Sequence, residues 1–159
     1  MEPSYKSYSV AEATQKLEHF CSYQERCHDE VMAKLRSMAM IPEAVDLIVV
    51  HLLQHNFLNE ERFARSFARG KHRIKHWGRI RIVAELKQRH ITQFNIKAGL
   101  SEISDDEYLE TFNAIAERHW ETIREGNKLR KRKKFCDYLL RKGFESDLVY
   151  QKAMELERI

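Results

Sequence analysis

The sequence predicts an all-α protein made of three tandem three-helix repeats, about nine helices, that form an elongated, curved body. Three observations predict this fold. The 159 residues include five glycines and two prolines, which is few for a protein rich in loops or sheets. Apolar residues recur at helical spacing along the chain. The same apolar pattern then occurs three times, and tandem units of this size stack into extended bodies.

The repeated pattern has six apolar positions per copy, and successive copies are shifted by 51 and then 53 residues. Each copy contains the same five-residue step between two helices, as from Leu35 to Met40, which helical periodicity alone does not require. The eighteen positions are Val31, Leu35, Met40, Val45, Val49 and Leu52, then Ile82, Leu86, Ile91, Ile96, Leu100 and Ile103, then Phe135, Leu139, Phe144, Val149, Ala153 and Leu156.

The repeats set the expected division of the chain. We expect a flexible N-terminus at 1–8, a first repeat at 9–57, a second at 58–103 and a third at 104–159. Each repeat begins with a leading helix of variable length, which is followed by the helix pair that carries the repeated apolar positions.

In the first repeat, Ser9-Val-Ala-Glu12 has the pattern of a capping box, so a helix is expected from there to about Tyr23. A second helix is expected over about 27–38. Pro42 opens the third, because its fixed φ suits the first turn of a helix, and the apolar stripe continues to about His55.

In the second repeat, Asn59 is the expected N-cap of a leading helix that ends near Lys75, before the interruption His76-Trp77-Gly78. Residues expected to face inward on this helix are Phe63, Phe67 and Ile74. Those expected to face inward on the next helix are Ile80, Val83 and Leu86. Trp77 is expected to close the elbow between the two helices, and stacking on a base or on a partner is the alternative.

In the third repeat, Ser104-Asp-Asp-Glu107 is a second capping-box pattern, and its helix is expected to run to about Ile123. Gly126-Asn127 is expected to end this helix. Gly143 is a suitable residue to end the following helix before Phe144.

Charge alternates in four blocks along the chain. There are 6 basic and 10 acidic side chains from Met1 to Ala64, 10 and 1 from Arg65 to Gly99, 2 and 8 from Leu100 to Asn127, and 10 and 5 from Lys128 to Ile159. The blocks therefore carry −4, +9, −6 and +5, within a net charge of +4. A basic band between acidic bands favours a directed surface for nucleic acid or for an acidic protein face.

The candidate partner-binding residues are the cations of the basic band and of a second run at the start of a later helix, because Lys and Arg at this density suit phosphate or carboxylate oxygens. A solvated basic face is the alternative. The residues are Arg65, Arg69, Lys71, Arg73, Lys75, Arg79, Arg81, Lys87, Arg89, Lys131, Arg132, Lys133 and Lys134. The second run lies at a helix N-terminus, where cations are unfavourable, so it predicts a compensating partner or fraying.

The sequence offers no signature of catalysis. No nucleophile motif, carboxylate-pair motif or glycine-rich phosphate loop is found, so neither an enzyme nor a cofactor is expected. The pairs His51/His55 and His72/His76 have helical spacing but no obvious third ligand, so a metal site is not expected either. Three cysteines without zinc or redox spacing, together with the lack of a signal core or apolar span, favour free thiols in the cytoplasm and no membrane association.

The central motifs resemble a known family. Leu58-Asn-Glu-Glu-Arg-Phe-Ala64, then Gly78-Arg-Ile-Arg81 and Glu85-Leu86-Lys87, resemble the central signature of the RecX proteins, which are bacterial regulators of the RecA recombinase. Arg26-Cys-His-Asp-Glu-Val31 is similar to the first-unit motif of that family. The family usually has glycine where this chain has Ala39 and His90, which predicts altered helix ends.

The resemblance implies a protein that binds in the groove of the RecA filament on single-stranded DNA. It also implies modulation, with inhibition as the expected direction, of the recombinase, ATPase and coprotease activities of RecA. The family's central basic positions carry over to Arg79, Arg81, Lys87 and Arg89, while Arg62 and Phe63 are expected to be structural. Free DNA is a further expected partner, and the expected state is a monomer. A stand-alone DNA-binding protein that contacts phosphates through the 65–90 band is the alternative.

Overall fold

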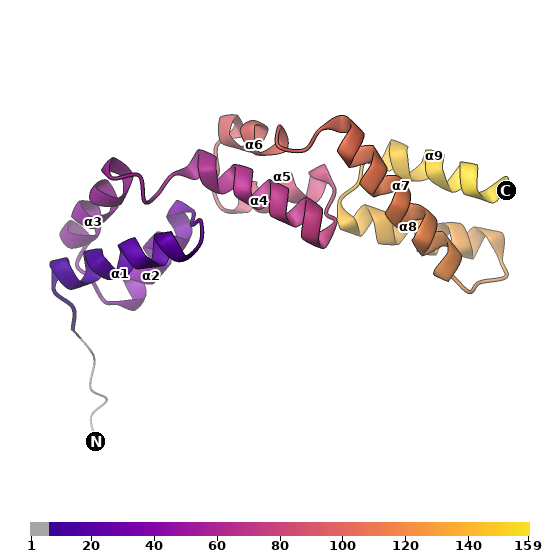
Figure 1. Ribbon diagram of the computed structural model, residues 1–159. Coiled ribbons are helices and arrows are strands. Elements are labelled where there is room, and N and C mark those ends of the chain that lie inside the picture. The colour runs from indigo at the N-terminus through magenta and orange to yellow at the C-terminus, as the bar shows by residue number, and fades with distance from the viewer. Residues whose placement is uncertain (1–6) are drawn as a thin grey trace, which may run out of the picture.

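The computed structural model describes residues 7–159, and in that range the chain forms nine α-helices and no strand (Figure 1). The helices are α1 (Val10–Tyr23), α2 (His28–Ser37), α3 (Pro42–Gln54), α4 (Glu60–Lys75), α5 (Arg79–Gln88), α6 (Gln93–Leu100), α7 (Asp105–Thr122), α8 (Lys128–Lys142) and α9 (Ser146–Glu157). We call α1–α3 unit 1, α4–α6 unit 2 and α7–α9 unit 3.

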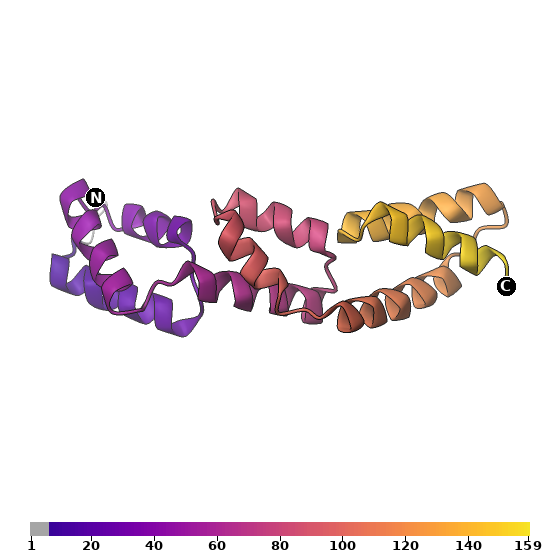
Figure 2. The ribbon, with the colours of Figure 1, turned by 90° about the horizontal axis from the view of Figure 1, so that it is seen from above.

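The three units follow one another along a rod, with unit 1 at one end and the C-terminal end of the chain at the other (Figures 1 and 2). In the view of Figure 1 the units form a shallow arc, and the third helix of each unit (α3, α6 and α9) lies on its upper side. This architecture confirms the predicted all-α repeat fold. Of the expected flexible segment 1–8, residues 1–6 lie outside the described part, and Tyr8 packs partly buried against the core of unit 1.

The repeated apolar pattern is the core pattern of the molecule. Fifteen of the eighteen positions are buried, and the other three, Met40, Leu100 and Leu156, pack partly buried against the same cores. Burial at matching positions in three units is what stacked repeats require, because each unit must cover its apolar face.

The five-residue step is one turn built three times. The amide of the sixth residue bonds to the carbonyl of the first at N···O distances of 3.5 Å (Met40 to Leu35), 3.1 Å (Ile91 to Leu86) and 3.2 Å (Phe144 to Leu139). The preceding residue is left-handed each time, with φ 53° at Ala39, 59° at His90 and 98° at Gly143. The two turns without glycine keep this hydrogen bond, but α2 and α5 end one residue earlier relative to it than α8, which ends directly before Gly143. The expectation of altered helix ends thus agrees with the difference among the three units, and two non-glycine residues adopt a disfavoured conformation.

The helix starts follow the capping patterns closely. Ser9 and Glu12 form the full reciprocal capping box, and the side chain of Asn59 accepts from the amide of Arg62 at 2.9 Å. Ser104 accepts from the amide of Glu107 at 3.1 Å, but the Glu107 carboxylate binds Arg73 and does not complete that box. Gly126-Asn127 follows α7 and supplies the N-cap of α8.

Two residues expected in the core lie at the surface. Ile74 is 74% exposed and Ile80 is 54% exposed. Each is two positions, or about 200° of helix rotation, from the buried residue that defines the inner face, His72 on α4 and Ile82 on α5. The inner face of α4 is completed by Phe63, Ala64 and Ala68, as the burial pattern of that helix requires.

Units 2 and 3 share a continuous hydrophobic core, whereas unit 1 has a core of its own. The shared core runs from Phe63 on α4 to Ala153 on α9, and it includes Cys27 from unit 1. The unit 1 core runs from Ala13 to Leu58. Burial of apolar surface therefore joins units 2 and 3 more extensively than it joins unit 1 to either of them.

Backbone atoms form the joint between units 2 and 3. The Gly78 amide donates to the carbonyl of Lys142 at 2.7 Å, and the Ile80 amide donates to that of Gly143 at 2.9 Å. A Cβ at position 78 would lie 2.3 Å from the Gly143 carbonyl, so the two segments approach this closely only because both residues are glycine.

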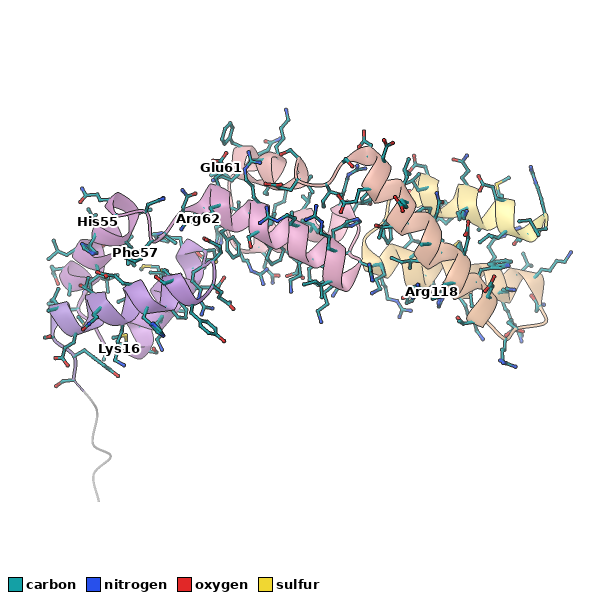
Figure 3. All side chains as sticks on the ribbon, viewed as in Figure 1. Lys16, His55, Phe57, Glu61, Arg62 and Arg118 are labelled. Carbon is teal, nitrogen blue, oxygen red and sulfur yellow. The ribbon has the colours of Figure 1, made fainter. Side chains whose placement is uncertain are left out.

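Side chains form the joint between units 1 and 2. Arg62, which Figure 3 places at the passage from α3 to α4, pairs with Glu25 at 2.6 Å and donates to two carbonyls before α4. His90 Nδ1 lies 2.7 Å from a carboxylate oxygen of Asp29. The structural role expected for Arg62 is thus confirmed, as is the burial of Phe63.

Candidate functional site

The arginines on α4 face an acidic partner within the chain. Arg65 and Arg69 both pair with Glu102, at 3.3 and 3.2 Å, and Arg73 binds Glu107 at 2.9 Å. Glu102 follows α6 and Glu107 lies in the first turn of α7, so the acidic block folds onto the basic band. The hydrogen bonds from Arg73 lower the pKa of Glu107 below its usual value, which agrees with an ionised pair.

Arg79 belongs to the joint between units 2 and 3. Its guanidinium lies 3.8 Å from the ring centroid of Tyr108 and pairs with Asp105 at 2.7 Å. Its backbone amide donates to the Tyr108 hydroxyl at 3.1 Å, and that hydroxyl donates to Glu145 at 2.7 Å. Burial raises the pKa of Tyr108, so the hydroxyl stays protonated as this bridge requires.

The second cationic run is also compensated within the chain. Arg132 Nε binds Glu157 at 2.7 Å, Lys133 binds Asp137 at 2.8 Å and Lys134 binds Glu125 at 3.3 Å. Asn127 caps α8 by accepting from the amide of Arg130. Of the predicted residues in this run, Lys131 alone lacks a carboxylate partner in the described range, and it lies over the ring of Trp120 at 4.2 Å.

A different set of predicted cations gathers on aromatic rings at the elbow between α4 and α5. The Arg81 guanidinium lies 4.1 Å from the Trp77 ring, and Lys71 lies 5.0 Å from Trp77 and 5.5 Å from Phe67. Arg89 lies 4.9 Å from Phe67, whose ring meets Trp77 edge-on at 6.2 Å. We call these five residues the aromatic–cation ladder: Phe67, Lys71, Trp77, Arg81 and Arg89.

The ladder is partly exposed and mostly free of carboxylates. All five of its side chains are half-buried, and Arg89 alone among its cations forms an ion pair in the described range, with Glu85 at 2.9 Å. Lys87 and Lys75 are exposed and form no ion pair there. Cations that are held in place on rings and not neutralised can bind phosphates or carboxylates, and the rings add stacking surfaces.

The structure thus divides the thirteen predicted residues into two groups. Eight are engaged by carboxylates of the chain itself: Arg65, Arg69, Arg73, Arg79, Arg89, Arg132, Lys133 and Lys134. Five have no carboxylate partner among residues 7–159: Lys71, Lys75, Arg81, Lys87 and Lys131. Charge counting did not single out Phe67, whose ring is part of the ladder. The available signal was a second aromatic residue, Trp77, two positions after the end of α4.

The histidines and cysteines have structural surroundings. His72 is fully buried and its Nδ1 lies 2.9 Å from the Trp77 carbonyl, so it ties the elbow to α4. This contact and the packing of Trp77 on the core favour the elbow interpretation of that residue. All three cysteines are buried, and burial raises the pKa of Cys27 to about 11. In the described range no three potential ligand residues cluster as a metal site would need.

Comparison with known proteins identifies the family. The model of the second three-helix domain of RecX matches residues 59–100, and the model of the third three-helix domain matches residues 105–152. The chain belongs to the RecX family. The matched segments correspond to units 2 and 3, the part of the molecule that shares one core.

Curated relatives are named regulatory protein RecX. The one from Lactobacillus johnsonii is 30% identical over 110 residues, which are 69% of this chain and 41% of the relative. That from Enterococcus faecalis is 27% identical over 94% of this chain and 56% of its own length, and that from Prosthecochloris aestuarii is 26% identical over 86% and 88%. The chain spans about half the length of the first two relatives. Its family is one of regulatory proteins.

Solved RecX structures have the same fold. A crystal structure of regulatory protein RecX superposes with a TM-score of 0.81 at 23% identity, over 92% of this chain and 73% of that one. RecX from Lactobacillus salivarius gives 0.76 at 24% identity, over 94% and 97%. None of the helices in the described range is long and apolar enough to cross a membrane.

Proposed function

We propose that the chain binds the RecA filament on single-stranded DNA and modulates the recombinase, ATPase and coprotease activities of RecA, with inhibition as the direction. Membership of a family of regulatory proteins supports the class of function. The central signature between Leu58 and Lys87, which resembles that of RecA regulators, supports the partner.

The residues of the aromatic–cation ladder support the proposal most directly. Two of its cations, Lys71 and Arg81, have no neutralising carboxylate among the described residues, and neither has the exposed Lys87, whereas the arginine stripe on α4 is paired with Glu102 and Glu107. Cations without carboxylate partners are the ones that can bind DNA phosphates or an acidic protein face. We therefore assign the partner contact to the ladder, Lys87 and Lys131, and we assign Arg79 to the joint.

The test is the single-stranded-DNA-dependent ATPase rate of RecA from the same organism, titrated with this protein at two salt concentrations. We expect substoichiometric inhibition that weakens with salt. Lys87→Glu should raise the half-inhibitory concentration about fivefold or more, because it reverses an uncompensated charge. The matched control is Lys133→Glu, an exposed lysine already paired with Asp137, which should change it less than about twofold.

Two results would contradict the proposal. One is an unchanged ATPase rate at several-fold excess of the protein with RecA fully active. Selective binding of duplex DNA without RecA would then favour the stand-alone DNA-binding alternative. The other is equal loss of inhibition by Lys87→Glu and Lys133→Glu, which would mean that net charge and not the ladder surface drives binding.

A further inference from the structure

A second cationic cleft lies in unit 1, away from the ladder. It is formed between α1 and α2 and is lined by Lys16, His19, Phe20, Tyr23, Arg26 and Lys34. Tyr23 is 76% exposed at the end of α1, and Phe20 is half-buried at the base of the cleft. None of these residues belongs to the basic band of unit 2.

The charge of this cleft is opposite to that of its surroundings. Residues 9–57 contain four Lys or Arg and seven Asp or Glu, yet three of the four cations line the cleft and none of the seven carboxylates does. Three of the carboxylates have partners outside the cleft, since Glu18 binds His51, Glu25 binds Arg62 and Asp29 binds His90, and a fourth, Glu30, pairs with Arg26. An acidic unit that concentrates its cations in one cleft presents a local positive potential there.

One ring of the cleft, that of Phe20, already has two cations over it. The Arg26 guanidinium lies 3.7 Å from the Phe20 ring centroid, and Lys34 Nζ lies 5.8 Å from it. Arg26 is further fixed by its bond to the Phe20 carbonyl at 3.0 Å and by Glu30 at 3.6 Å. Lys16 and Lys34 have no carboxylate partner among the described residues, so the charges available to a ligand are two ammonium groups.

We propose that this cleft binds single-stranded nucleic acid, with Lys16 and Lys34 on phosphates and a base stacked on Tyr23. Ammonium groups act as point charges that suit phosphate. The guanidinium of Arg26, whose planar geometry would suit a carboxylate better, already binds Glu30 and the Phe20 carbonyl. An exposed ring beside cations is the arrangement that binds unpaired bases without regard to sequence. What is new is the site, because the free DNA expected as a partner is here given a place in unit 1, apart from the basic band and from the RecA role.

The experiment is a fluorescence anisotropy titration of labelled oligothymidylate with the full chain, in the absence of RecA, over a series of salt concentrations. Lys34→Gln is compared with Arg36→Gln, which removes the fourth cation of unit 1 from the same helix but outside the cleft. We expect Lys34→Gln to reduce the slope of log affinity against log salt by about 0.7, and Arg36→Gln to leave it unchanged. Tyr23→Leu should weaken binding about fivefold or more, whereas Tyr23→Phe should not.

The proposal fails if the protein does not bind the strand at low salt, or if Lys34→Gln and Arg36→Gln behave alike. It also fails if an oligoglutamate of equal charge competes as well as unlabelled oligothymidylate, since the cleft would then be a site for acidic peptides. Circular dichroism of each variant shows whether the fold is kept. Because RecA is absent from the assay, this result and that of the ATPase test are independent.

Discussion

Units 2 and 3 meet through backbone hydrogen bonds and a shared core, whereas units 1 and 2 meet through side chains, in an arginine–glutamate ion pair and a histidine–aspartate contact. At the first joint two glycine-containing segments touch, and the Tyr108 hydroxyl bridges Arg79 and Glu145. At the second, Arg62 pairs with Glu25, and His90 Nδ1 lies 2.7 Å from a carboxylate oxygen of Asp29. Backbone and apolar contacts resist salt, but partly exposed ion pairs weaken with it.

Similar repeats in one rod are therefore joined by contacts of different kinds. Units 2 and 3, which carry the ladder and most of the uncompensated cations, form one packed body. Unit 1 carries the nucleic-acid cleft that we propose, and it is attached to that body by groups that water and salt can reach. We expect unit 1 to adjust its position on a partner more easily than unit 3 does.

The largest loss of stability should come from a methyl group added at the close contact between units 2 and 3. In Gly143→Ala the new methyl group would lie 2.3 Å from Arg81 Cβ, at a residue whose φ is 98°. We expect a loss of about 3 kcal/mol or more in the free energy of unfolding, measured by urea denaturation. Gly126→Ala, where no atom lies within 4 Å of the added carbon, is the control. Equal effects of the two would mean that the glycine contact is unimportant.

The next effect concerns the buried hydroxyl at the same joint. Tyr108→Phe leaves the Arg79 amide and the Glu145 carboxylate without their shared partner. The expected cost is about 1–3 kcal/mol in urea denaturation. Tyr150→Phe is the matched control, since Tyr150 is 52% exposed. A Tyr108→Phe protein as stable as the wild type would show that the bridge contributes nothing net.

A smaller effect is expected at the joint between units 1 and 2. Arg62→Ala removes the pair with Glu25 and two bonds to carbonyls, but the Arg62 side chain is 37% exposed and water screens the pair. We expect a cost of about 1 kcal/mol that shrinks in high salt. Arg36→Ala, which removes a bond within one helix, should be nearly neutral. A salt-independent loss would argue that the joint is not ionic.

Two substitutions in the repeated turn are expected to stabilise the protein, and they also test the joint between units 1 and 2. Ala39→Gly removes the cost of a left-handed alanine and should stabilise the protein by about 0.5 kcal/mol after the backbone entropy of glycine is counted. His90→Gly should gain less, because it also removes the pair with Asp29 between units 1 and 2. Urea midpoints measure both variants, and a larger gain for His90→Gly would show that this pair does not stabilise the joint.

The smallest effect is a dependence on pH. Because Arg73 lowers the pKa of Glu107, the pair stabilises the folded state above the ordinary carboxyl pKa of 4.5, and this contribution is lost as pH falls through the lower folded value. Glu107→Gln should therefore lower the urea midpoint at pH 7, and this difference should shrink as the pH falls below 4.5. Asp106→Asn, in the same turn, is the control, and a difference that does not shrink as the pH is lowered would contradict the assignment.

The sequence predicts the fold well because the fold is local. Helical periodicity, the caps at Ser9 and Asn59 and the five-residue step depend on neighbours in the chain, and the structure confirms each of them. The sequence does not place Ile74 and Ile80 correctly, because the apolar residues of a helix do not by themselves fix which side is buried.

The site is harder to predict because it depends on distant contacts. Charge counting finds the basic band, but it cannot show that Glu102 reaches back to Arg65 and Arg69. Nor can it show that Arg79 lies in a joint with Tyr108. Which cations remain available to a partner is decided by how α6 and α7 pack on α4, and no local pattern records that packing.

The most direct test of the proposed partner surface is lysine footprinting by acetylation and mass spectrometry, with and without the RecA filament on single-stranded DNA. We expect Lys71, Lys87 and Lys131, which lack carboxylate partners in the described range, to lose reactivity when the filament is present. Lys133 and Lys134, paired with Asp137 and Glu125, should keep theirs. Equal protection of all five lysines, or protection of the paired two alone, would contradict it.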